Sequence, residues 1–287
     1  MRHERSTGLF LASPYIVFFT IFWLIPIAAA LVMVFLDWDL VTPPRYAGTE
    51  NIELLLQDVR FGRALLNTLV FLAVNIPLQV ALALALALAL NRNIIMRSFW
   101  RGTFFLPVVI SGAAVTVLWK ALYSTDVGLL NQMLNAAGVR SVPWLTDPTL
   151  AMPAIAVMVT WKNVGFYIVL YLAGLQYVPR TCYEAMAIEG ATPWQQFRNV
   201  TWPLLRPVTG LVTTLSVING FQVFIEPYVM TGGGPLRRTL SPVLYMYKQA
   251  FGYQKMGYAA TIGVALALIM AACLFVGRKL AAGKEAA

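Results

Sequence analysis

Polar side chains that could contact a polar solute lie inside an otherwise apolar stretch of this sequence. Trp161, Lys162, Asn163 and Tyr167 occur within about two helical turns of one another. Aromatic faces stack on sugar rings and amides form hydrogen bonds with hydroxyl groups, so these residue types suit a path for a hydroxyl-rich solute. Lys162 has a second interpretation, because a lysine deep in a membrane also pairs with a carboxylate such as Glu226, or extends its amine toward water.

A second set of polar residues, Asn219, Gln222 and Glu226, recurs at intervals of three and four positions. That spacing predicts one polar face on a single helix. Such a face lines a water-filled cavity or a subunit interface, or it forms ordinary hydrogen bonds between helices. The sequence leaves these alternatives open.

The sequence offers no cluster of residues for catalysis or metal binding. His3 is its one histidine. Cys182 falls in a predicted cytoplasmic loop and Cys273 inside a predicted membrane span, so neither a disulfide nor a metal cluster is expected. In the run TGGGP, Pro235 stands where a phosphate-binding loop continues with lysine and a hydroxyl residue. We therefore expect no catalytic residue, no metal and no cofactor on this chain, and a membrane enzyme finds no support.

The elements that must position these residues are membrane-spanning helices. The chain is 59% hydrophobic and 11% charged, whereas soluble domains are about 45–50% apolar and about 25% charged. A helix needs roughly 20 apolar residues to cross a bilayer. The sequence predicts an all-α integral membrane protein of one domain, residues 1–287. Its six predicted spans cover residues 9–36, 64–90, 103–122, 151–175, 207–229 and 258–277.

Basic residues between the second and third spans predict the orientation of the chain. This segment carries Arg92, Arg97 and Arg101 without an acid, and cytoplasmic flanks have an excess of lysine and arginine. We therefore expect both termini in the cytoplasm. On this topology the net charge of +9 reflects orientation in the membrane and indicates no nucleic-acid partner.

A polar segment, residues 176–206, separates the fourth and fifth spans and has its own helix signals. Pro179 suits the first turn of a helix, and Gly190 suits the left-handed stop. Thr192 followed by Gln195 predicts a capping box for a second short helix. This second helix is expected to end before Pro203.

The same segment resembles the cytoplasmic Glu-Ala-Ala loop of permease subunits in ABC importers. The resemblance rests on Glu184-Ala185, Gly190-Ala191, Val200 and Pro203. It extends in order through SPYIVFFTIFWLIP, VPWLTDPTLA, GLQYVPR, TGGGP and YMYKQAFGYQKMGYAA, which are similar to stretches of carbohydrate and glycerol-phosphate importer permeases. The chain departs from the family pattern with Met186 for the second alanine, Glu189 for aspartate, Val200 for isoleucine and Trp202 for leucine.

This resemblance implies a coupling helix that docks on a cytoplasmic ATPase, with Glu184 as polar anchor, Ala185 as close contact and Gly190 as corner. It also implies a second permease subunit, two ATPase subunits that hold ATP and Mg, a solute-binding protein outside, and a bacterial or archaeal inner membrane. The solute would be a sugar or a related polar molecule. The residues that the resemblance assigns to the ATPase contact are Tyr183, Glu184, Ala185, Met186, Gly190 and Ala191.

An ion-coupled secondary transporter is the main alternative. Such a protein works without an ATPase and uses carboxylates or histidines deep in the bilayer. Glu226, close to the outer end of the fifth predicted span, is the one candidate of this kind in the sequence.

Overall fold

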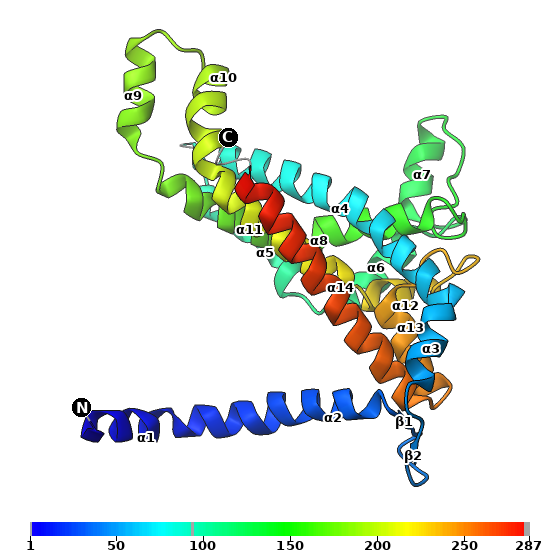
Figure 1. The fold of residues 1–287 in the computed structure, drawn as a ribbon. Helices are drawn as coiled ribbons and strands as arrows, with labels where there is room; N and C mark the ends of the chain where they lie inside the picture. The colour runs from blue at the N-terminus through cyan, green and yellow to red at the C-terminus, as the bar shows by residue number, and fades with distance from the viewer. Residues whose placement is uncertain (1, 93–94, 284–287) are drawn as a thin grey trace. The chain divides into compact units, whose positions relative to one another are not determined.

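The computed structural model describes residues 2–92 and 95–283 and is almost entirely helical in this range (Figure 1). Among the described residues, two short strands are present, β1 (Leu36–Asp37) and β2 (Arg45–Tyr46), which pair antiparallel with Leu36 opposite Tyr46. The helices are α1 (Arg2–Phe19), α2 (Ile25–Met33), α3 (Glu50–Gln57), α4 (Val59–Asn91), α5 (Arg97–Val109), α6 (Gly112–Leu122), α7 (Leu129–Ala136), α8 (Ala151–Gln176), α9 (Arg180–Ile188), α10 (Pro193–Gln196), α11 (Trp202–Phe221), α12 (Ile225–Thr231), α13 (Pro242–Tyr247) and α14 (Met256–Gly283), with π-helices at Thr20–Leu24, Phe197–Thr201 and Lys248–Gly252.

Five helical segments are long and apolar enough to cross a membrane, and a sixth is obtained if α5 and α6 count as one bent span. The five are Leu11–Met33, Val59–Asn91, Ala151–Gln176, Pro193–Phe221 and Met256–Gly277. The prediction of an all-α membrane protein is confirmed.

The third predicted span is not one continuous helix. α5 and α6 are bent by 97° at Ile110 and Ser111. Both residues have extended backbone angles, with ψ near 144° and 126°, which no α-helix contains. Pro107 precedes the break within α5, and a serine and a glycine follow it, so local signals for a break were present in the sequence.

The fifth predicted span differs at both ends. Its helix begins at Pro193, runs through the π-helix Phe197–Thr201 and ends at Phe221. The expectation that the second helix of the polar segment stops before Pro203 is therefore wrong. Pro203 is the second residue of α11 and directly follows the π-helix, where the helix already departs from the regular hydrogen bonds between residues four apart that a proline would interrupt.

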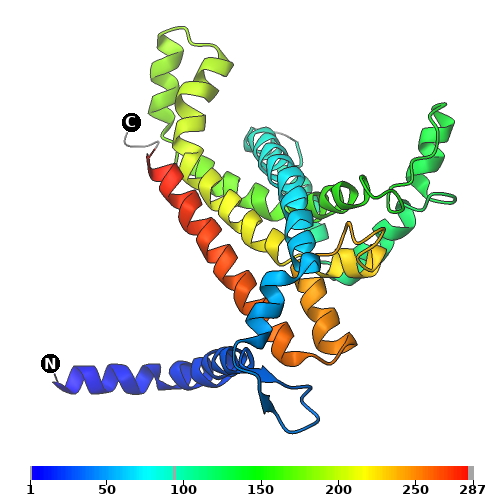
Figure 2. The ribbon, with the colours of Figure 1, turned by 45° about the vertical axis from the view of Figure 1, so that its right-hand side comes forward.

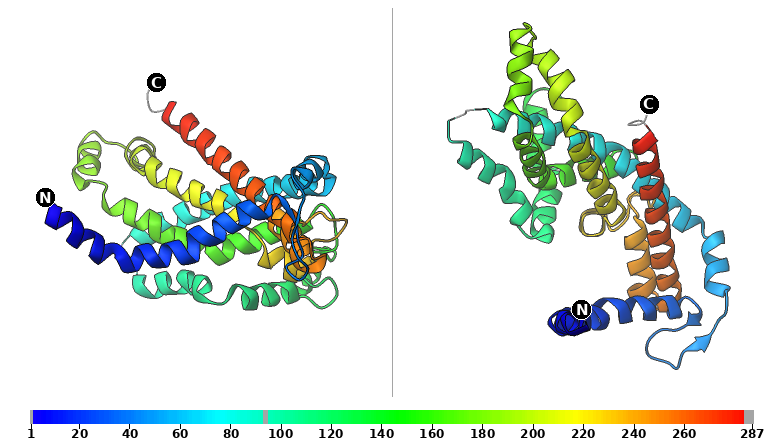
Figure 3. Two further views of the ribbon diagram at one scale, coloured as in Figure 1. Left: turned by 60° about the horizontal axis from the view of Figure 1, so that its bottom comes forward. Right: turned by 60° about the vertical axis from the view of Figure 1, so that its left-hand side comes forward.

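The chain forms two compact units, which we describe separately. The first contains the residues up to Phe61 together with Tyr245–Ile269. In it, α1, the first π-helix and α2 follow one another without interruption and form the dark blue rod in Figure 3. The β1–β2 hairpin joins α2 to α3, as Figure 2 shows in blue.

The second unit contains Gly62–Leu244 and the residues from Met270 onward, and its core lies among α4, α8 and α11. Small side chains on α4 let these helices approach closely, as is common in membrane proteins. At Gly165 of α8 the approach is closest, since a Cβ there would lie 2.1 Å from the carbonyl oxygen of Phe104 on α5. The side chains of this core include Ala83, Ala87, Tyr167, Tyr171, Leu172, Leu205 and Val212.

Candidate functional site

The polar segment forms a hairpin of two helical arms, which project together at the upper left of Figure 1. The first arm, α9, ends as the sequence predicts. Gly190 adopts a left-handed conformation with φ of 75°. The Ala191 N–H donates to the Met186 carbonyl at 2.9 Å and the Gly190 N–H donates to the Ala187 carbonyl at 3.1 Å. This pair of bonds is the Schellman motif, which ends the helix firmly and turns the chain.

The second arm of the hairpin begins with the predicted capping box. The Thr192 hydroxyl accepts from the Gln195 N–H, and the Gln195 side chain accepts from the Thr192 N–H at 2.7 Å. The arms are joined by a hydrogen bond of 2.8 Å between the hydroxyl groups of Tyr183 and Thr201. Both ends of the corner are therefore fixed by hydrogen bonds, so the hairpin is built as a stiff unit.

The residues assigned to the ATPase contact divide into two groups. Glu184, Ala185 and Gly190 are exposed, whereas Tyr183, Met186 and Ala191 are half-buried. The Tyr183 hydroxyl is used inside the hairpin.

Two apolar side chains of the hairpin, Ile188 and Trp194, are 88% and 67% exposed. Neither is among the residues assigned to the contact. Ile188 is apolar in the sequence next to the assigned residues, but its outward direction is visible only in the structure.

The polar residues of α8 and α12 meet at one ion pair. The Lys162 amine lies 3.0 Å from a Glu226 carboxylate oxygen, and their side chains are 16% and 9% exposed. The pairing that the sequence offered as the alternative for Lys162 is therefore present. Gly112 lies beside it, because a Cβ at this position would be 2.9 Å from the Lys162 amine. The break before α6 brings this glycine to the pair, and sequence reasoning had not identified it.

The prediction of one polar helix face for Asn219, Gln222 and Glu226 is wrong. α11 ends at Phe221, Gln222 caps its C-terminus, and Glu226 lies in the first turn of α12. The chain leaves helical geometry between them, so the spacing of three and four no longer aligns their side chains. Asn219 and Gln222 are exposed, whereas Glu226 is buried.

Two further contacts connect the remaining predicted residues. The Asn219 amide donates to the Tyr167 hydroxyl at 3.2 Å. Trp161 is 42% exposed and its ring centre lies 5.3 Å from that of Trp119. Asn163 is half-buried on α8. Four of the seven predicted residues thus form two pairs, Asn219 with Tyr167 and Lys162 with Glu226, whereas Trp161, Asn163 and Gln222 belong to neither pair.

The end of α6 and the start of α8 are fastened by polar contacts. The Tyr123 hydroxyl donates to the Ala154 carbonyl at 3.0 Å, and burial raises the pKa of Tyr123 to about 12. Asp147 accepts from the hydroxyl and N–H of Thr149, both at 2.6 Å, and these bonds lower the pKa of the carboxyl. Lys120 donates to the Val229 carbonyl at 2.9 Å, which links α6 to α12.

Comparison with known proteins gives a family match over most of the chain. A family model described as "Binding-protein-dependent transport system inner membrane component" matches residues 57–282. The lactose transport system permease protein LacF of Rhizobium radiobacter is 35% identical, over 96% of this chain and 93% of LacF. The arabinooligosaccharides transport system permease protein AraP of Halalkalibacterium halodurans is also 35% identical, over 93% of this chain and 85% of AraP.

A solved structure has the same fold. A bacterial ABC transporter involved in the import of the acidic polysaccharide alginate contains a chain that superposes with a TM-score of 0.82. The two chains are 24% identical, and the superposition covers 97% of this chain and 96% of the other.

Proposed function

Because this chain belongs to the inner-membrane components of binding-protein-dependent transport systems, the permeases of ABC importers, we propose that it forms half of the path for a carbohydrate and is driven by a partner ATPase. A second permease subunit forms the other half, two ATPase subunits bind ATP and Mg, and a solute-binding protein delivers the sugar from outside. Both termini lie in the cytoplasm of a bacterial or archaeal cell. Hydrolysis takes place on the partner subunits, so this chain carries no catalytic residue.

The carbohydrate is supported by the relatives. LacF is a permease for lactose and AraP for arabinooligosaccharides, and each is 35% identical to this chain. The diacetylchitobiose uptake system permease protein NgcF of Streptomyces coelicolor is 33% identical, over 96% of this chain and 83% of NgcF. A solute-binding protein is supported by a second alginate transporter structure, which includes a pentasaccharide-bound periplasmic protein.

The single observation that carries the coupling proposal is the capped hairpin α9–α10. Closure of two ATPase subunits around ATP is a rigid-body motion, and a stiff lever transmits such a motion to the spans. The hairpin has fixed ends at Gly190 and Thr192, and its second arm continues directly into α11. Glu184, Ala185 and Ile188 are exposed on the first arm, where they can contact the ATPase.

The solute path is proposed to pass the polar groups of α8 and α11. Asn219 and Gln222 supply exposed amides, and Trp161 supplies an aromatic side chain that is partly exposed. The ion-coupled alternative is weakened by the contact between Glu226 and Lys162, because the one carboxylate on which it relies already pairs with a lysine, and this charge would compete with a coupling cation.

The test is ATP-driven uptake of lactose, arabinobiose or diacetylchitobiose by the complete transporter in vesicles, with Gly190→Val in this subunit. Valine at φ of 75° is strained, so the corner must change and uptake should fall to a small fraction of the wild-type rate. Gly210→Val is the matched control, since Gly210 has open space around its Cα and an ordinary helical backbone. Normal uptake by Gly190→Val, or full-rate transport by this subunit without any ATPase, would overturn the proposal.

A further inference from the structure

The first unit contains a polar cavity that none of the functions above uses. Its volume is about 670 Å³, and it is lined by α3, the start of α4, and the segment from Tyr245 to Tyr258. Sites for small molecules measure about 300–1,000 Å³. The cavity is therefore large enough for a disaccharide-sized molecule, and its lining residues all belong to one compact unit.

One wall of the cavity is held by a buried arrangement of hydroxyl groups. Asp58 accepts hydrogen bonds from the hydroxyls of Tyr245 and Tyr258, both at 2.5 Å. Gly257 lies against β1, since a Cβ there would be 1.8 Å from the Leu36 carbonyl oxygen. These contacts fix α13 and α14 against the turn before α4, so this wall is preformed.

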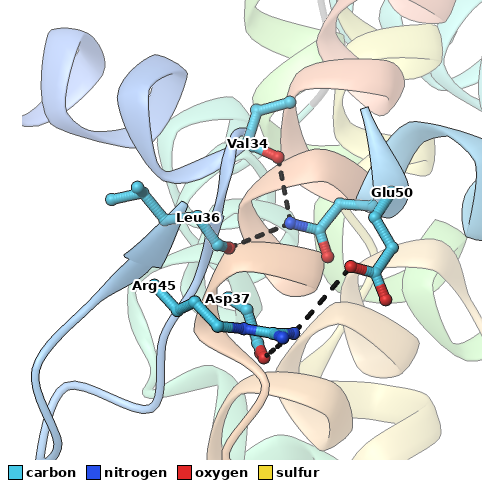
Figure 4. A network of polar contacts seen from close by, with 6 residues as sticks. Val34, Leu36, Asp37, Arg45 and Glu50 are labelled. Carbon is cyan, nitrogen blue, oxygen red and sulfur yellow. Dashed lines mark hydrogen bonds and ion pairs between the residues drawn. The ribbon is translucent and has the colours of Figure 1, made fainter. Parts of the chain in front are cut away.

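The part of the lining formed by α3 is also fixed by hydrogen bonds. The Asn51 amide donates to the carbonyls of Val34 and Leu36, both at 2.9 Å, and thereby ties α3 to the C-cap of α2 and to β1. Figure 4 shows these two carbonyls beside Arg45, whose guanidinium group lies 3.0 Å from Asp37 and 3.9 Å from Glu50.

The charges around the cavity are mixed. The carboxylates of Asp37 and Glu50 face the guanidinium group of Arg45, and the lining also includes two bases, Arg60 and Lys255. A cavity with both signs of charge is suited to a neutral molecule that offers many hydroxyl groups, because each charged group can hydrogen-bond a hydroxyl without requiring a counter-ion.

The lining also provides groups that recognise a sugar ring. The Gln57 amide is exposed, and an amide donates to one hydroxyl while accepting from another. Tyr253 is 61% exposed and offers an apolar ring face next to its polar hydroxyl. Gln57 lies in α3 and Tyr253 lies just before α14, far apart in the sequence. The fold brings both residues to the same cavity.

We propose that this cavity is a binding subsite for a neutral saccharide, separate from the polar groups of α8, α11 and α12. The proposal rests on the proposed function for the presence of the sugar. On the proposed orientation the cavity lies on the outer side, where it would hold one end of an incoming oligosaccharide.

The experiment is photolabelling of the complete transporter in vesicles with diazirine derivatives of lactose, arabinobiose and diacetylchitobiose, followed by peptide mapping. At least one of these probes should label peptides from residues 50–60 or 245–258. Tyr253→Ala and Gln57→Leu should each lower that labelling about fivefold or more. Tyr46→Ala is the matched control, because Tyr46 is 77% exposed in the same unit and does not line the cavity.

Three outcomes would overturn the proposal: labelling that is absent from these peptides, labelling that both cavity variants leave unchanged, and equally strong competition by an acidic digalacturonate. Uptake measured in the same vesicles separates the two proposals. ATP-driven uptake without cavity labelling rejects the subsite and leaves the transport function in place, whereas cavity labelling without ATP-driven uptake rejects the transport function.

Discussion

Lys162 and Glu226 form a mostly buried ion pair in a protein that crosses a membrane. Such a pair adds little net stability, but removal of one partner leaves the other charge buried and uncompensated. The pair itself connects α8 with α12. Gly112, the first residue of α6 after the break, lies beside the Lys162 amine, so three helices meet at the pair. This arrangement explains why an apolar span contains a lysine.

We expect Lys162→Met and Glu226→Leu to destabilise the protein individually by about 3–5 kcal/mol each, because each leaves one unpaired charge. The double variant should recover most of this loss. Thermal unfolding of the detergent-purified chain measures the effect as a double-mutant cycle. If the two losses simply add, the pair makes no energetic contact.

Asp58 depends on its hydrogen bonds for its ionised form. Burial raises the pKa of this carboxyl, but hydrogen bonds from Tyr245 and Tyr258 and from the N–H groups of Arg60 and Phe61 outweigh burial, and the pKa is lowered from 3.8. In turn, burial and the hydrogen bond to Asp58 raise the pKa of Tyr245 to about 12.

A lowered folded pKa stabilises the protein above the unfolded value, and this contribution disappears as the pH falls through the folded value. We therefore expect Asp58→Asn to be less stable than the wild type at pH 7 by roughly 1.5–3 kcal/mol, the worth of hydrogen bonds to a charged group. The difference should shrink below about pH 4. Thermal unfolding across pH 3–8 measures it, with Asp126→Asn as an exposed control. A difference that does not change with pH would contradict the role of the charge.

At the scale of elements, the contact between α5 and α8 depends on one missing side chain. A Cβ at Gly165 would lie 2.1 Å from the Phe104 carbonyl oxygen, and a backbone atom cannot move aside as a flexible side chain does. We expect Gly165→Ala to cost about 1–3 kcal/mol through overpacking, measured by thermal unfolding. Gly102→Ala on α5 is the control, because nothing lies within 4 Å of the added atom. Equal stability of the two variants would show that α5 and α8 are not in close contact.

The elements that could be predicted from the sequence are those with local signals. Gly190 and the Thr192–Gln195 capping box specify their own conformations, so the hairpin corner was predicted correctly. Hydrophobic length likewise identified α4 and α8 to within a few residues. The breaks at Ile110 and after Phe221 were missed, because hydrophobic length alone joins the segments on either side into one span. The local signals, Ser111 and Gly112 at the first break and Gln222 at the second, were given no weight.

The polar sites show the same limit. The partner of Lys162 was one of several possibilities until the fold placed α12 against α8. The shared face of Asn219, Gln222 and Glu226 was predicted from helical spacing, which assumes one continuous helix. This assumption fails because α11 ends at Phe221. The cavity beside Asp58 joins residues separated by about two hundred positions, which spacing rules cannot relate.

At the scale of the whole molecule, labelling of Cys182 can report on which side of the membrane the hairpin lies. Cys182 lies in the hairpin and is half-buried, and Cys273 lies in a predicted span. We expect a membrane-impermeant maleimide to label Cys182 in inside-out vesicles and not in right-side-out vesicles, because the hairpin faces the cytoplasm. Mass spectrometry measures the labelling, and Cys182→Ser removes the signal. Labelling from the outside alone would reverse the topology.

The length of α4 has a consequence for the membrane itself. This helix has 33 residues and is therefore about 50 Å long, whereas the hydrocarbon layer is about 30 Å thick. The excess must be absorbed by tilt or by an end that stands clear of the lipid tails. A helix with this excess length can span bilayers that are thinner or thicker than average by changing its tilt angle.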